Sequence, residues 1–219
     1  MKTQNIQPYQ SSMVTLLLPG WATSTEILKP YIKSEDMRCL ENINIHHIIK
    51  EIQHLNDADK AFQFVSFSMG GFVVHDYLKS IRQKDPELKP LKNCQGWHAF
   101  GLRPSYPFKD VENVRRSLLS NPAAFLKTFF ENEGKDCHVS PFKDYIEDFN
   151  LEALLTGLQF LGASNLESTV LKSLPFPCYF YQGLRDRIAP FREMKTFLNG
   201  IKNAYLIPLK GGHFSFQNV

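Results

Sequence analysis

Short continuous apolar runs alternate with helix-like stretches along much of the chain. The run Met13–Leu18 (MVTLLL) stops at Pro19-Gly20, and the run Phe62–Phe67 (FQFVSF) is followed by the pair Gly70-Gly71. Continuous apolar runs of this length that end at turn residues are typical of buried parallel strands. A weaker strand is predicted over Arg38–Ile43.

The same pattern continues further along the chain. Strands are predicted over Asn93–Phe100, Cys178–Gln182 and Ala204–Leu209, and helices over Phe72–Ile81 and Phe191–Asn199. Strands that alternate with helices in this way favour a mainly parallel sheet covered by helices. The predicted fold class is therefore α/β.

The residues from 102 to 174 show helical spacing instead. Asn121 precedes Pro122, and Asn150 precedes Leu151, so each asparagine is a predicted helix N-cap. We expect a helical cap over residues 102–174, inserted in a core formed by residues 1–101 and 175–219.

Composition narrows the classes of protein. The 219 residues suit one domain, 43% are hydrophobic, and the net charge of +3 is too weak to indicate nucleic acid. No apolar run reaches the roughly 20 residues of a membrane helix, and the first ten residues contain no signal-peptide pattern. The scattered Cys39, Cys94, Cys137 and Cys178 predict free thiols, no metal site and a cytoplasmic location. We expect a monomer.

One motif lies between a strand and a helix. The segment Ser66–Gly71 (SFSMGG) has small residues two before and two after Ser68. This pattern is typical of the nucleophile elbow of α/β hydrolases, a sharp turn that holds a serine hydroxyl at the sheet edge beside a helix N-terminus. Ser68 is therefore the predicted nucleophile. The alternative is a glycine-rich helix start with a purely structural role.

An acid and a base follow in the order expected after such a serine. Asp186 comes just after the strand Cys178–Gln182, and His213 follows Gly211-Gly212 just after the last strand. An aspartate there can fix the tautomer of a histidine that takes the serine proton. The alternatives are a surface-turn aspartate and an exposed histidine near the end of the chain.

Two backbone amides are candidate donors to an oxyanion. One belongs to Met69, which follows the nucleophile, and the other to Trp21, which follows Pro19-Gly20. The Trp21 ring is also a candidate wall of an acyl channel. The alternative is a plain turn with a packed tryptophan.

The segments LLPGW, SFSMGG, YQGLRDRIAP and GGHFSF together resemble the α/β-hydrolase superfamily. More narrowly, LLPGW, the stretch from TGLQFLG to RDRIAP and the compact cap resemble the pimeloyl-acyl-carrier-protein methyl ester carboxylesterases of biotin synthesis. The resemblance implies the triad Ser68, Asp186 and His213, with Trp21 and Met69 at the oxyanion. The chain departs from many relatives in having Pro19 where they have histidine and Ser66 where they have glycine.

The resemblance also implies cap arginines that hold an acidic carrier protein. Five basic and two acidic residues lie between Gly101 and Phe130. The candidate carrier contacts are Arg103, Arg115, Arg116 and Lys127; the alternative is an ordinary solvated helix face. Phe125 and Phe129 are candidate walls of an acyl pocket, and each fits the core equally well.

The expected function is serine carboxylesterase activity without a cofactor. The expected substrate is an acyl methyl ester, in particular one carried on acyl carrier protein. The enzymatic alternatives are a generic short-chain esterase and an acyl thioesterase. An alternative of another class is a hydrolase-fold binding protein with a dead site.

Overall fold

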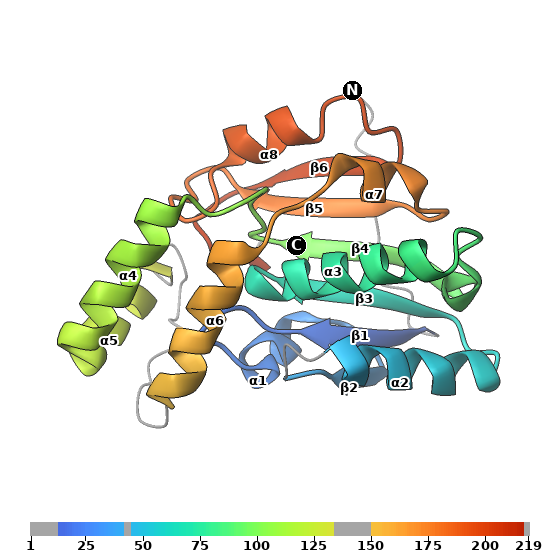
Figure 1. Ribbon diagram of the computed structural model, residues 1–219, viewed down its shortest axis with the longest axis horizontal. Coiled ribbons are helices and arrows are strands. Elements are labelled where there is room, and N and C mark those ends of the chain that lie inside the picture. Colours follow the sequence, from blue (N-terminus) through green and yellow to red (C-terminus); the bar gives the residue numbers. More distant parts are fainter. Residues whose placement is uncertain (1–12, 42–44, 134–149, 217–219) are drawn as a thin grey trace.

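A six-stranded sheet forms the centre of the molecule (Figure 1). The computed structural model describes residues 13–41, 45–133 and 150–216. The strand order is β2-β1-β3-β4-β5-β6, and every neighbouring pair is parallel. The predicted parallel α/β sheet is thus confirmed. The strands are β1 (Val14–Leu18), β2 (Asp36–Cys39), β3 (Phe62–Phe67), β4 (Cys94–Phe100), β5 (Cys178–Gly183) and β6 (Ala204–Leu209).

Strand β2 differs most from its predicted range. It begins two residues before Arg38 and ends at Cys39, and residues 42–44 lie outside the described residues. All four of its residues are half-buried, whereas all five of β1 are buried. A strand paired on one side only buries less apolar surface, so its hydrophobic pattern in the sequence is weak.

Helices cover one face of the sheet. They comprise α2 (Ile45–Asp57), α3 (Met69–Lys84), α7 (Ser168–Ser173) and α8 (Phe191–Phe197), with the short 3₁₀ turn η2 (Lys89–Leu91). The short helix α1 (Thr25–Leu28) leads into the 3₁₀ turn η1 (Lys29–Tyr31), whose Tyr31 packs on the other face against Phe214 and Phe216. Helix α3 lies between α2 and α7 and in front of β3 in Figure 1. Helix α7 is joined to α3 by the ion pair between Lys79 and Glu167, and the Glu167 amide donates to His75 Nε2 over 2.9 Å.

The opposite face of the sheet is covered by the chain that follows the last strand. Alternate residues of β3 point to opposite faces. Phe64 contacts Tyr77 of α3, whereas Phe67 packs edge-on against Phe214 and Phe216. These contacts place residues 214–216 directly beneath the strand that leads to Ser68.

Three further helices lie beyond the carboxyl ends of the strands, at the left of Figure 1. They are α4 (Phe108–Ser120), α5 (Pro122–Glu133) and α6 (Leu151–Ala163). Both predicted N-caps are confirmed: Asn121 Oδ1 accepts from the Ala124 amide, and Asn150 Oδ1 accepts from the amides of Glu152 and Ala153.

The segments that enter and leave this helical group are joined at its base. Ser105 and Asn165 form an isolated antiparallel bridge, and the Leu166 amide donates to the Pro104 carbonyl over 2.8 Å. Because α7 packs on α3 instead, we propose that the cap consists of α4, α5 and α6.

No helix among the described residues is long and apolar enough to cross a membrane. Cys39, Cys94 and Cys178 are free thiols, and Cys137 lies outside the described residues. Within the described ranges, no group of three or more His, Cys, Asp or Glu residues could hold a metal ion.

Candidate active site

Ser68 lies at a strained turn between β3 and α3. Its φ of 47° and ψ of −114° are a conformation that L-residues rarely adopt. The turn is held from both sides, because the Ser68 amide donates to the Phe100 carbonyl over 2.8 Å and the Ser68 carbonyl accepts from the Gly71 amide over 2.9 Å. The strand and the helix thus fix the serine at the carboxyl edge of the sheet.

The residues two before and two after Ser68 are explained by different contacts. A Cβ atom on Gly70 would lie 2.5 Å from the Pro19 carbonyl oxygen, so only glycine lets α3 begin this close to the end of β1. Ser66 stands where many relatives have glycine. Its hydroxyl accepts a 2.9 Å hydrogen bond from the Trp97 indole, which gives the extra side chain a buried partner.

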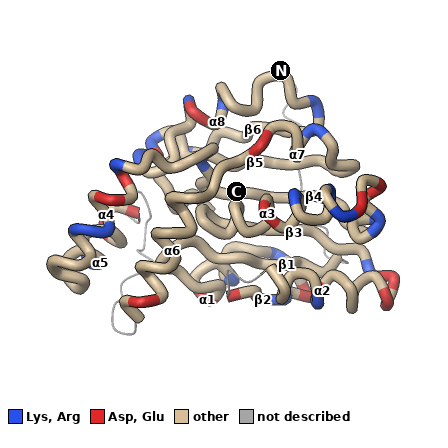
Figure 2. Tube along the Cα trace, viewed as in Figure 1, with Lys and Arg blue, Asp and Glu red and all other residues tan. Residues whose placement is uncertain are grey.

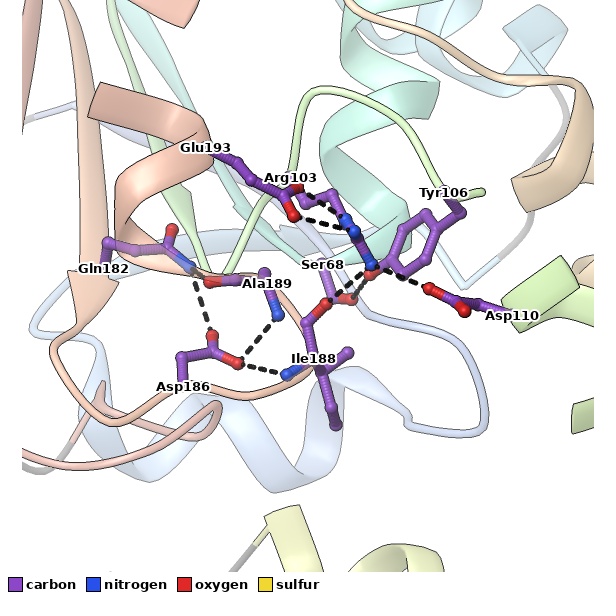
Figure 3. Close-up of polar contacts among 9 residues, drawn as sticks. All are labelled: Ser68, Arg103, Tyr106, Asp110, Gln182, Asp186, Ile188, Ala189 and Glu193. Carbon is purple, nitrogen blue, oxygen red and sulfur yellow. Dashed lines mark hydrogen bonds and ion pairs between the residues drawn. The ribbon is translucent and has the colours of Figure 1, made fainter. Parts of the chain in front are cut away.

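Asp186 is held in the loop after β5 by a full set of hydrogen bonds (Figure 3). Its Oδ1 accepts from the amides of Ile188 and Ala189, each over 2.8 Å. Its Oδ2 accepts from Gln182 Nε2 over 3.1 Å and from His213 Nδ1 over 2.8 Å. The carboxylate is buried but fully satisfied, so its orientation toward His213 is fixed.

Glycines let the His213 loop approach the sheet. A Cβ atom on Gly183, at the end of β5, would collide with the Gly212 carbonyl oxygen. A Cβ atom on Gly101, which has a φ of 57°, would lie 3.0 Å from His213 Cε1. Gly211 has a φ of 112°, a value that glycine adopts readily. These positions place the buried imidazole between the ends of β4 and β5.

The electrostatic surroundings of His213 favour its cation. Burial by itself lowers the pKa of His213, but the charge and hydrogen bond of Asp186, together with the charge of Glu133, raise it overall. His213 Nε2 has no hydrogen-bond partner among the described residues. Ser68 Oγ lies 3.5 Å from the Tyr106 hydroxyl. The predicted acid and the predicted base are thus in hydrogen-bond contact, and the predicted nucleophile is paired with a tyrosine.

A cavity of about 350 Å³ joins these groups to the cap. Ser68 and His213 line it, as does the ring of Trp21. Both predicted pocket residues also line it: Phe129 packs edge-on against Trp21 at 5.1 Å between ring centroids, and the ring of Phe125 is tilted against Trp21 at 6.3 Å. The cavity therefore has an apolar wall from the cap and a polar floor from the loops at the sheet edge.

Trp21 and Met69 lie together near the same edge. The Trp21 indole donates to the Leu154 carbonyl of α6 over 2.9 Å, and Gly157 leaves room for both side chains. Among the described residues, neither the Trp21 amide nor the Met69 amide donates to another backbone carbonyl. Both amides therefore stay candidate donors to an oxyanion.

The prediction that Arg103 is a surface contact is wrong. Arg103 is buried because its guanidinium forms a bidentate pair with Glu193, at 2.9 Å for each bond, and lies over the Tyr106 ring (Figure 3). It also donates to the Ile188 carbonyl and lies 3.5 Å from Asp110. Its role in the structure is to join the Asp186 loop to the base of the cap.

The other predicted carrier contacts are exposed on the cap. Arg115 is paired with Glu112 one turn earlier on α4, and Arg116 donates to Asn113. Lys127 lies on the exposed side of α5. Figure 2 shows basic and acidic residues interleaved along α4, so this surface is a mixture of charges.

Two residues that the sequence analysis did not single out lie beside the predicted triad. Tyr106 lies in the loop after β4, at the edge where the strands end, and burial raises its pKa to about 12. Glu133 belongs to the buried face of α5, along with Leu126 and Phe130. The spacing of 126, 130 and 133 is helical, so a charged residue on an apolar face was a visible signal.

Comparisons with known proteins identify the fold. No family model matches the sequence. A curated protein of Bacillus subtilis, the AB hydrolase superfamily protein YisY, is 29% identical over 163 residues, which are 68% of this chain. The chain spans about 59% of the length of that relative. Solved structures decide the fold, because an esterase from Exiguobacterium antarcticum superposes with a TM-score of 0.72 over 95% of this chain and 87% of that one.

The chain has the α/β-hydrolase fold.

Further structures with this fold support the assignment. A hydrolase from Oleispira antarctica has a TM-score of 0.70 at 10% identity and covers 93% of this chain and 85% of its own. A bromoperoxidase from Bacillus anthracis has a TM-score of 0.69 at 17% identity, with 94% and 86% covered. In the α/β-hydrolase fold a nucleophile elbow follows a central strand, and Ser68 follows β3, which lies between β1 and β4.

Proposed function

We propose that the protein is a serine hydrolase of carboxylic esters, with Ser68 as nucleophile, His213 as base and Asp186 as the group that orients His213. The observation that carries this proposal is the buried 2.8 Å contact between His213 and Asp186 in a cavity that Ser68 also lines. The strained turn at Ser68 supports it, since such strain is concentrated at functional sites.

In the first half of the reaction, His213 Nε2 accepts the Ser68 proton while Ser68 Oγ attacks the ester carbonyl carbon. Asp186 stabilises the imidazolium that forms. The amides of Trp21 and Met69 donate to the oxyanion of the tetrahedral intermediate. The carbon–oxygen bond to the alcohol then breaks, and His213 returns its proton to the departing alkoxide.

In the second half, water takes the place of the alcohol. His213 accepts a proton from the water as it attacks the acyl-enzyme, and the new oxyanion occupies the same two amides. Collapse of this intermediate breaks the bond to Ser68 Oγ, which takes the proton back from His213, and releases the carboxylic acid. The cycle uses only groups of this chain, the ester and water.

The cavity favours an acyl group of small to medium size. Its volume of about 350 Å³ is at the lower end of ligand pockets, and Phe125, Phe129 and Leu158 give it an apolar wall. Together with the resemblance to the biotin-pathway carboxylesterases, this supports a methyl ester of pimeloyl-acyl-carrier protein as the substrate. Short-chain esters and acyl thioesters remain the competing substrates.

The exposed cations of the cap are opposite in charge to an acidic carrier protein. Arg116 and Lys127 are the relevant residues, since Arg103 is buried and Arg115 is paired with Glu112. Contacts of this type act mainly on the rate of association. Arg116→Glu combined with Lys127→Glu should raise KM for a carrier-borne ester several-fold at low salt, and added salt should reduce the difference. A free short-chain ester is the control, because its KM should not change.

The substrate is tested by side-by-side kinetics. Purified protein is assayed on pimeloyl-acyl-carrier-protein methyl ester, p-nitrophenyl butyrate and an acyl thioester, with Ser68→Ala as the blank. The proposal expects the first substrate to have the highest kcat/KM. A flat or reversed preference would contradict the biotin assignment but leave the esterase proposal intact. No hydrolysis of any of the three would favour a binding protein.

A further inference from the structure

Glu133 is a buried carboxyl with an open oxygen beside the catalytic histidine. It ends helix α5 of the cap and is only 2% exposed. Its Oε1 lies 3.7 Å from His213 Nε2, and its Oε2 has no hydrogen-bond partner among the described residues. A buried carboxyl without such partners is costly, so its position needs a reason beyond packing.

His213 is therefore held between two carboxyls. Asp186, from the loop after β5, contacts Nδ1 at 2.8 Å, and Glu133, from the cap, faces Nε2. The other charged groups that line the cavity are Arg103, Asp110 and Arg187. Arg103 is already engaged by Glu193. Among the described residues, Asp186 and Glu133 are the charged groups that act on the imidazole.

We propose that Glu133 is a positioning residue that acts through His213: its carboxylate stabilises the imidazolium formed when His213 accepts the Ser68 proton. The inference rests on the proposed function. In this step the Ser68 O–H bond breaks and an N–H bond forms at Nε2, and Glu133 gains no proton. Glu133 faces the nitrogen that changes charge, whereas Asp186 is confined to the other nitrogen.

The same contact gives the site a pH dependence with a definite sign. Burial raises the pKa of Glu133 to about 8, although His213 opposes this shift. At lower pH the pair therefore holds one shared proton, either on Glu133 or on His213. When the proton is on His213, Nε2 cannot accept from Ser68, and when it is on Glu133, the neutral carboxyl does not stabilise the imidazolium. The reaction is therefore fastest after the pair has lost this proton.

Removing the Glu133 carboxyl should change both the pKa of His213 and the stabilisation of its imidazolium. In Glu133→Gln and Glu133→Met, the pKa of His213 should fall, since the negative charge that raises it is gone. The acidic limb of the pH profile should then move to lower pH, while the plateau rate falls because the imidazolium loses a counter-charge. Glu131→Gln is the matched control, since Glu131 lies on the same helix but is exposed.

The experiment is the rate of labelling by a fluorophosphonate probe across the pH range. We expect the acidic midpoint of both Glu133 variants to fall by about one unit, so that one unit below the wild-type midpoint they react about fivefold faster relative to their own plateaus. Glu131→Gln should follow the wild type. An unchanged or raised midpoint in both variants would overturn the inference.

A direct titration distinguishes failure of the inference from failure of the proposed function. The His213 imidazole can be followed by NMR in the wild type and in Glu133→Gln without any reaction. If the wild type is not labelled at any pH, the proposed function fails, and the titration still decides the coupling. A lower His213 pKa in the variant supports it, and an equal pKa contradicts it.

Discussion

Asp186 and Glu133 face the two nitrogens of the His213 ring. Asp186 comes from a loop at the edge of the sheet, and Glu133 comes from a helix of the cap. Asp186 belongs to a loop at the sheet edge and accepts four hydrogen bonds. Glu133 belongs to the cap, and no hydrogen bond is found for its Oε2 among the described residues. Both carboxyls are buried, but only Asp186 has the donors that compensate for burial.

This difference indicates that the sheet-edge loops and the cap have separate roles. The sheet-edge loops fix the catalytic groups through backbone amides and glycine turns, so their geometry follows from the fold. The cap adds side chains from above: Phe125 and Phe129 shape the cavity, and Glu133 changes the charge around the base. We therefore expect substitutions at the sheet edge to affect the chemistry most, and substitutions from the cap side to adjust rate, pH dependence and substrate choice.

The largest effect is expected for Asp186→Asn. An amide in this position favours the wrong tautomer of His213 and removes the counter-charge of the imidazolium, so kcat should fall about 10⁴-fold. Steady-state hydrolysis of p-nitrophenyl butyrate measures this change.

Asp76→Asn is the matched control for Asp186→Asn. Asp76 Oδ1 lies 3.5 Å from Nδ1 of another histidine, His75, which does not line the cavity. Its substitution should leave kcat within about twofold of the wild type. Equal losses in the two variants would mean that the contact with His213 has no special role.

Two glycine substitutions, one at the elbow and one in the cap, should differ in their effect on stability. Gly70→Ala forces a Cβ atom against the carbonyl oxygens of Pro19 and Leu18, so it should reduce the free energy of unfolding by about 1–3 kcal/mol. In Gly162→Ala of α6, the nearest atom is a Val111 methyl at 3.4 Å, and the change should be neutral or stabilising by up to about 1 kcal/mol. Denaturant unfolding measures both. Equal destabilisation would contradict the contrast between the elbow and the cap.

A smaller effect is expected for Tyr106→Phe, which removes the hydroxyl 3.5 Å from Ser68 Oγ and keeps the ring. A neutral hydrogen bond of this kind contributes about 0.5–1.5 kcal/mol, so kcat/KM should change by about two- to tenfold. The measurement is ester hydrolysis at the plateau of the pH profile. A loss as large as that of Asp186→Asn would mean that the tyrosine is part of the catalytic set.

The sequence predicted the central strands well because strands such as β1 and β3 are buried along their whole length. Continuous apolar runs such as Met13–Leu18 have few other interpretations, and glycines mark where the strands end. The ends of the half-buried strand β2 were predicted incorrectly, because apolar and polar residues alternate too weakly along it to define them. The candidate triad could be read from short motifs because chain order and strand ends are local properties.

The cap contributions were harder to predict because they depend on how helices dock. Arg103 was taken for a surface charge, and only the fold brings Glu193, ninety residues away, against its guanidinium. Glu133 lies on the apolar face of α5, which a helical projection reveals. Its contact with His213 depends on the packing of two segments eighty residues apart, and no local pattern contains that information.

The most direct test of the account is fluorophosphonate labelling followed by peptide mapping, with wild type and Ser68→Ala compared at the same concentration. We expect the wild type to carry one probe molecule, attached at Ser68, and Ser68→Ala to carry none. A wild type that stays unlabelled, or a Ser68→Ala variant labelled as fast as the wild type, would contradict the assignment of Ser68 as the nucleophile.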